Sequence, residues 1–200
     1  MPGEPARRLD FRSWARLGRP VVREYQEEYF VRVALVVDTH VPRRERRDRF
    51  GDSPRLEAAI SLAASIADAL SRGENLIDVL GAGREVQFLQ AGRHRAPLEQ
   101  ILENLACLEP TRDDPTELLH ASLAEHWRSL STMICVFLQA NPARRNLVQA
   151  ALEAGCSVKV ILIESDRRDR QAEEELAALP GIELTLLRPE QILAGTMHEL

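Results

Sequence analysis

The chain has 200 residues, of which 44% are hydrophobic and 28% charged, the composition of one globular domain with a core of its own. Its formal net charge of −5 argues against nucleic-acid binding by the surface as a whole. The sequence contains no apolar run of the roughly 18 residues that a transmembrane helix needs, and no signal-peptide core follows Met1.

Residues 1–28 form an arm that is rich in arginine and too poor in apolar residues to fold alone. Six arginines surround a small apolar set that includes Phe11 and Trp14. Gly18 and Pro20 argue against a long helix in this segment. We expect the arm to pack on the sheet domain of residues 29–200, although arginines interleaved with aromatic rings are also typical of nucleic-acid binding.

The residues from Val33 to Val37 form the segment around which the rest of the chain is organised. They are an almost continuous apolar run rich in β-branched residues, which predicts a strand buried on both faces within a parallel sheet. The run ends at Asp38-Thr39-His40. Open α/β sheets bind their ligands at the carboxyl ends of their strands, so Asp38 is the first candidate site residue.

A basic loop follows this strand. It contains Arg43, Arg44, Arg46 and Arg47, which are candidates for binding an acidic partner or a nucleic acid. Acidic residues inside the same loop partly neutralise the arginines. The simpler interpretation is therefore a solvated loop.

Helix signals then alternate with short apolar runs. Ser53-Pro54, Asp114-Pro115 and Asn141-Pro142 each place a capping side chain before a proline, which predicts helix starts, and Pro97 opens another helix. Two apolar runs on either side of Gly81-Ala82-Gly83 predict a β-hairpin over residues 76–90. Further strands are predicted at 133–138, 158–163 and 182–187, with a short helix at 170–179 and a final turn or short helix from Pro189.

This order of elements predicts an α/β domain with a doubly wound, mostly parallel sheet and helices on both faces. One strand of the hairpin must run antiparallel to its neighbour. The edge of the sheet is the most economical place for that strand.

Motifs for catalysis are missing from the sequence. There is no phosphate-binding loop, no G-x-S-x-G elbow and no H-E-x-x-H pair of histidines. Cys107, Cys135 and Cys156 lie in apolar patterns without C-x-x-C spacing, so we expect buried, reduced thiols in a cytoplasmic protein.

A sequence motif spans the arm and the first strand. It reads Leu9-Asp10-Phe11-Arg12-Ser13-Trp14, then Arg19-Pro20-Val21-Val22-Arg23-Glu24-Tyr25, and then the strand into Asp38-Thr39. This motif resembles that of the domain of unknown function 58 family. With the lead-in Pro2-Gly3-Glu4-Pro5, the close likeness covers residues 2–39. The resemblance implies a von Willebrand factor A-like fold in a bacterial protein, often encoded beside a MoxR-type AAA+ ATPase. It also implies a membrane-anchored region before the motif in longer members. We therefore expect a cytoplasmic protein, tethered to the inner membrane only in a longer form.

The resemblance further implies a metal-ion-dependent adhesion site for magnesium, built from D-x-S-x-S, a distant threonine and an aspartate after the fourth strand. Here the first motif reads Asp38-Thr39-His40-Val41-Pro42, so His40 and Pro42 replace both serines. Residues 138–141 contain no aspartate, and Thr111 and Thr116 are the candidates for the distant threonine. One carboxylate and one threonine are too few ligands for Mg²⁺. We therefore expect no metal or other cofactor, and an Asp38 that accepts hydrogen bonds from backbone amides.

These observations predict a non-enzymatic protein-interaction module with a degenerate adhesion site. Its expected partners are a MoxR-type AAA+ ATPase and other proteins that it helps to assemble or mature. The alternative is a metal-dependent hydrolase that uses Asp38 and His40 at the carboxyl edge of the sheet. Nucleic-acid binding through the arm is a third possibility, which we do not favour, and membrane contact is expected only through a region outside this chain.

Overall fold

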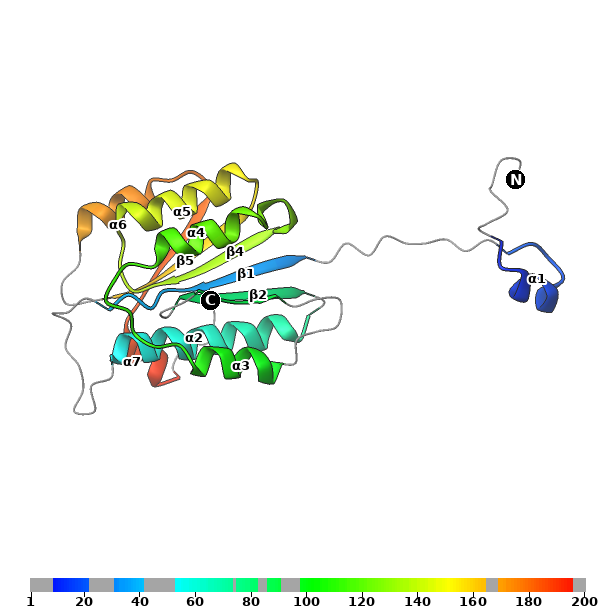
Figure 1. The fold of residues 1–200 in the computed structure, drawn as a ribbon, viewed down its shortest axis with the longest axis horizontal. Coiled ribbons are helices and arrows are strands. Elements are labelled where there is room, and N and C mark those ends of the chain that lie inside the picture. The colour runs from blue at the N-terminus through cyan, green and yellow to red at the C-terminus, as the bar shows by residue number, and fades with distance from the viewer. Residues whose placement is uncertain are drawn as a thin grey trace.

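A computed structural model of the chain describes residues 9–21, 31–41, 53–73, 75–82, 86–90, 98–164 and 169–195. A six-stranded sheet with the order β3-β2-β1-β4-β5-β6 forms its centre (Figure 1). The pairs β2–β1, β1–β4, β4–β5 and β5–β6 are parallel, whereas β3 pairs antiparallel with β2 at one edge. The strands are β1 (Arg32–Val37), β2 (Leu76–Ala82), β3 (Val86–Gln90), β4 (Thr132–Phe137), β5 (Ser157–Ile163) and β6 (Ile182–Leu187).

Strand β1 is an inner strand that pairs on both sides, with β2 and β4. Every residue from Val33 to Val37 is buried, which confirms the prediction from its continuous apolar sequence. Val36 faces one core cluster and Leu35 faces the other, because successive side chains of a strand point to opposite faces. Asp38 therefore follows directly on a strand that is buried on both faces.

Helices cover both faces of the sheet, as predicted for a doubly wound domain (Figure 1). One face packs against α4 (Thr116–Ala124), α5 (Pro142–Glu153) and α6 (Arg170–Ala177). The other face packs against α2 (Pro54–Ser71), with α3 (Leu98–Ala106) and α7 (Pro189–Leu193) beside it.

The capping signals place the helix starts correctly. The Ser53 hydroxyl accepts a hydrogen bond from the Leu56 amide at 3.3 Å at the start of α2. The Asn141 side chain accepts one from the Arg144 amide at 2.9 Å at the start of α5. The helix expected after Asp114-Pro115 is α4, which ends at Ala124, and the chain continues into a 3-10 turn at Trp127–Ser129.

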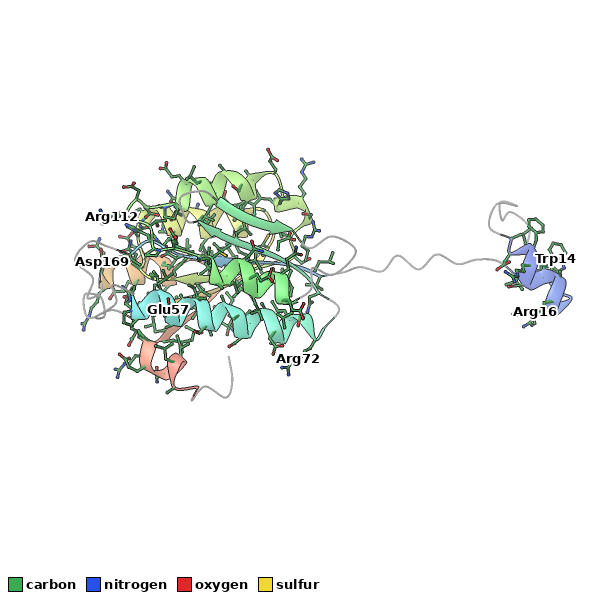
Figure 2. All side chains as sticks on the ribbon, turned by 60° about the horizontal axis from the view of Figure 1, so that its bottom comes forward. Trp14, Arg16, Glu57, Arg72, Arg112 and Asp169 are labelled. Carbon is green, nitrogen blue, oxygen red and sulfur yellow. The ribbon has the colours of Figure 1, made fainter. Side chains whose placement is uncertain are left out.

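The arm contains one short helix, α1 (Phe11–Leu17), which Asp10 caps and Gly18 ends in a left-handed conformation with φ of 66°. The rings of Phe11 and Trp14 stack on each other with centroids 6.2 Å apart. No residue of α1 is buried, and the helix lies apart from the sheet, with Trp14 and Arg16 on it (Figure 2). The described part of the arm therefore does not show the packing on the sheet domain that we expected.

The cysteines behave in two ways. Cys135 on β4 and Cys156 before β5 are buried, as predicted, and burial raises the pKa of both thiols. Cys107 is exposed, so its predicted burial was wrong. It follows the last residue of α3, and the buried apolar residues at this end of the helix are Leu105 and Leu108 instead.

Among the described residues, no helix is both long and apolar enough to cross a membrane.

Candidate functional site

The candidate site lies at the carboxyl edge of the sheet, where β1 and β4 end side by side. We call Asp38, Asp114 and Arg144 the carboxyl-edge cluster. Asp38 follows β1, Arg144 lies in the first turn of α5 after β4, and Asp114 precedes α4. Three separate segments of the chain thus place one charged side chain each at the same point.

Asp38 is 2% exposed and has four hydrogen-bond donors around it. The backbone amides of His40 and Leu138 each donate to its carboxylate at 2.9 Å, which confirms the expected bonds from backbone amides. Arg144 adds a two-point contact, Nε to Oδ2 at 2.9 Å and Nη2 to Oδ1 at 2.7 Å. Both carboxylate oxygens are therefore shared between an amide and a guanidinium.

Arg144 is completely buried and is the largest of the fully buried side chains of the described core. Its Nη1 donates to Asp114 at 2.7 Å, and its Cζ lies 5.8 Å from the centre of the Phe137 ring. A cation in the first turn of a helix faces the positive end of the helix dipole, which is unfavourable. Burial alone would lower the pKa of Arg144, but the charges of Asp38 and Asp114 outweigh burial, so its pKa is raised and it stays charged.

Asp114 closes the other side of the cluster, and its side chain is 29% exposed. Oδ1 accepts hydrogen bonds from the amide and hydroxyl of Thr116, and Oδ2 accepts from Arg144 and from Asn141 at 2.7 Å. Burial alone would raise the pKa of Asp114. The Thr116 hydrogen bonds and the charge of Arg144 outweigh that effect, so the pKa lies below its ordinary value.

The loop after β1 is tied to the segment before α4. Thr111 donates its amide to the Thr39 carbonyl at 2.8 Å, Val41 donates to the Thr111 carbonyl at 3.0 Å, and the Thr39 and Thr111 hydroxyls lie 3.3 Å apart. His40 Nδ1 lies 2.7 Å from the Gln139 amide nitrogen and 3.8 Å from Asp114 Oδ2. These contacts fix the position of Thr39, His40 and Val41 beside the cluster; we call these three residues the rim.

The predicted site residues thus fall into separate groups. Asp38 lies in the cluster, Thr116 reaches it through Asp114, and Thr111 contacts Thr39 beside it. His40 lies at the rim, against Gln139. The predicted partner-binding arginines, together with Pro42, lie outside the described residues: Arg43, Arg44, Arg46 and Arg47.

Reasoning from sequence missed Arg144 altogether and assigned Asp114 only to a helix cap. An arginine three residues after the capping Asn141, on the helix that follows an inner strand, was the available signal for Arg144. Asp114 does bond the first amide of α4, at 3.0 Å, so its local role concealed its contact with Arg144.

The donor set at this edge consists of N–H groups rather than open carboxylate oxygens. Both Asp38 oxygens and both Asp114 oxygens accept hydrogen bonds, and the Arg144 guanidinium lies between the two carboxylates. In the part of the chain that the structure describes, no three His, Cys, Asp or Glu side chains lie where they could jointly hold a metal ion. The cluster therefore lacks the ring of free oxygen ligands that Mg²⁺ requires.

Comparison with solved structures shows the fold. BatB, a conserved hypothetical protein from Bacteroides thetaiotaomicron, is 15% identical with a TM-score of 0.56, over 83% of this chain and 94% of that chain. Proximal thread matrix protein 1 from the mussel byssus is 12% identical with a TM-score of 0.58, over 82% of this chain and 44% of that chain. The SpRpn10 VWA domain is 9% identical with a TM-score of 0.50, over 80% and 89%. The sheet and its helices are thus similar to those of von Willebrand factor A domains.

Comparison with curated proteins finds no match to the chain. The comparison with protein families does find one, described as Protein of unknown function DUF58, over residues 1–186. This match covers the arm, β1 with Asp38, and the chain up to β6. The chain therefore belongs to the DUF58 family and carries that family's sequence on a von Willebrand factor A-like fold.

Proposed function

We propose that this protein is a non-enzymatic protein-interaction module that works without a bound metal ion. The observation that carries the proposal is the two-point contact between Asp38 and the fully buried Arg144. A von Willebrand factor A-like fold supports an interaction role, and the closed cluster supports a degenerate adhesion site. Recognition would then use the exposed side chains around the carboxyl edge rather than a metal.

The competing hypothesis is a hydrolase that uses Asp38 and His40. A general base needs an oxygen or nitrogen that can reach a water molecule or a substrate. Asp38 is 2% exposed and already accepts from two amides and Arg144, and His40 Nδ1 faces Gln139. These contacts leave Asp38 poorly placed to activate water, which favours the interaction module.

The proposed partner is a MoxR-type AAA+ ATPase, with which the domain would assemble or mature other proteins in the cytoplasm. Exposed charged residues of both signs lie at this end of the sheet domain. Arg112 and Asp113 are exposed just before Asp114, and Asp169 is exposed at the same end of the sheet domain as Arg112 (Figure 2). A surface that carries charges of both signs is better matched to a protein partner than to the uniformly negative backbone of a nucleic acid.

Binding between the purified chain and a MoxR-type ATPase from the same organism tests this proposal. We expect Arg112→Glu to weaken binding, because it reverses a charge on the proposed surface. Arg72→Glu is the matched control, since Arg72 is an exposed arginine at the other end of α2 from the carboxyl edge (Figure 2). Absence of binding, or an equal loss in both variants, would refute the proposal.

A further inference from the structure

We propose that Arg144 takes the place of a divalent cation at the carboxyl edge and is the residue that keeps this site free of metal. The family resemblance implies a metal site at this edge of the sheet, yet the residues present do not fit one. The disagreement centres on one side chain. The inference uses only the geometry of the cluster and does not depend on which partner binds.

Three carboxylate oxygen atoms face Arg144 in the cluster. Asp38 contributes both carboxylate oxygens, and Asp114 contributes Oδ2 at 2.7 Å from Nη1. The Thr116 hydroxyl and the Asn141 side chain are bonded to Asp114 and hold it in place. Two carboxylates with hydroxyl and amide groups around them are the kind of ligand set that binds a hard cation together with water.

Arg144 also supplies the positive charge of the cluster and fills the space between its two carboxylates. The cluster contains two carboxylates and one guanidinium, so Arg144 already neutralises half of the negative charge. The guanidinium makes three hydrogen bonds at 2.7–2.9 Å and packs over Phe137, so the space between the carboxylates is filled. A divalent ion would have to displace Arg144 from its hydrogen bonds to both carboxylates. Arg144 and a metal ion are therefore alternatives at one position.

Removing the arginine side chain should reverse this choice. In Arg144→Ala, two carboxylates would face a cavity that a long side chain had filled, with no cation between them. Unpaired carboxylates at a buried site are costly, so a hydrated divalent ion that neutralises them should bind and stabilise the fold. Arg144→Gln keeps a polar side chain of similar length but removes the charge, and we expect a weaker effect of the same sign.

The test measures the melting temperature of each variant in chelator and in millimolar Mg²⁺ or Mn²⁺. We expect Arg144→Ala to melt roughly 5–10 °C higher with the ion when the ion is at about a hundredfold excess over its Kd. Arg145→Ala is the matched control, because Arg145 is the next residue of α5 and makes no described hydrogen bond to Asp38 or Asp114. The double variant Arg144→Ala with Asp38→Asn should lose the response, because it removes one of the two carboxylates.

Direct binding of Mn²⁺, followed by electron paramagnetic resonance, provides a readout that is independent of stability. Saturable binding to Arg144→Ala, with none to the wild type or to Arg145→Ala, supports the inference. If both Arg144 variants are unfolded in chelator, recovery of helical circular dichroism on adding the ion supports it, and failure to recover overturns it. A folded Arg144→Ala that binds no ion, or a wild type that binds one at this site, also overturns it. Loss of ATPase binding alone would leave these results unchanged, so the two proposals fail separately.

Discussion

Substitution of Asp38 by alanine tests whether the carboxyl-edge cluster stabilises the fold. The change leaves Arg144, which is fully buried, paired only with Asp114, and it leaves the amides of His40 and Leu138 without their acceptor. Removing one partner of a buried ion pair typically costs about 3–5 kcal/mol. Each buried donor left unpaired costs about 1–3 kcal/mol, but these contributions overlap, so we expect a total loss of about 3–5 kcal/mol.

Urea denaturation at pH 7, followed by circular dichroism, measures this loss as a change in the free energy of unfolding. In a domain of this size the same loss lowers the melting temperature by roughly 6–20 °C. Asp68→Ala is the matched control, because Asp68 pairs with Arg72 on the surface of α2, where both side chains are well exposed. Such a pair contributes about 0–1 kcal/mol. A loss below about 1 kcal/mol in Asp38→Ala, or equal losses in the two variants, would refute the assignment of Asp38 to a buried structural pair.

Three further predictions concern metal binding, the titration of Asp114 and the accessibility of the cysteines. The wild type should melt within about 1 °C in chelator and in millimolar Mg²⁺ or Mn²⁺, because only an ion that binds the native state raises stability; a clear rise would contradict a metal-free site. The pKa of Asp114 is lowered in the folded state, so its contribution to the free energy of unfolding is complete above the unfolded pKa of about 4 and is lost as pH falls through the lower folded pKa. The free energy of unfolding of Asp114→Asn should therefore depend less on pH below about pH 4 than that of the wild type. Identical pH curves for the two proteins would contradict this. Ellman's reagent should label Cys107 in the native state but Cys135 and Cys156 only after unfolding, and three fast thiols would contradict their burial.

The sequence predicts those parts of the fold in which each residue depends on its near neighbours. A continuous apolar run predicted β1 because a strand buried on both faces has no polar side to show. A capping side chain followed by proline predicted α2 and α5, because both residues act within one helical turn. The same local reasoning failed at Cys107, where one position beyond the end of α3 decides between core and solvent.

The candidate site could be predicted only in part. Asp38 was identified because the end of an inner strand is a special place in any α/β sheet. Arg144 is 106 positions from Asp38 in the sequence. The contact between the two side chains depends on β4 lying next to β1 and on how α5 turns back over the sheet. An arginine in the first turn of a helix usually lies in solvent, so composition and periodicity gave no reason to bury this one.

A cation that belongs to the chain has consequences that a bound metal does not. The stabilisation from a bound ion rises with its concentration, whereas Arg144 is present in every folded molecule. A bound Mg²⁺ usually keeps several water ligands that an incoming group can replace, whereas Arg144 directs its described hydrogen bonds to Asp38 and Asp114 and is shielded from solvent. A partner that binds at this edge, as we propose, would therefore contact exposed groups such as Arg112 and the exposed part of Asp114, and its binding should be insensitive to divalent ions.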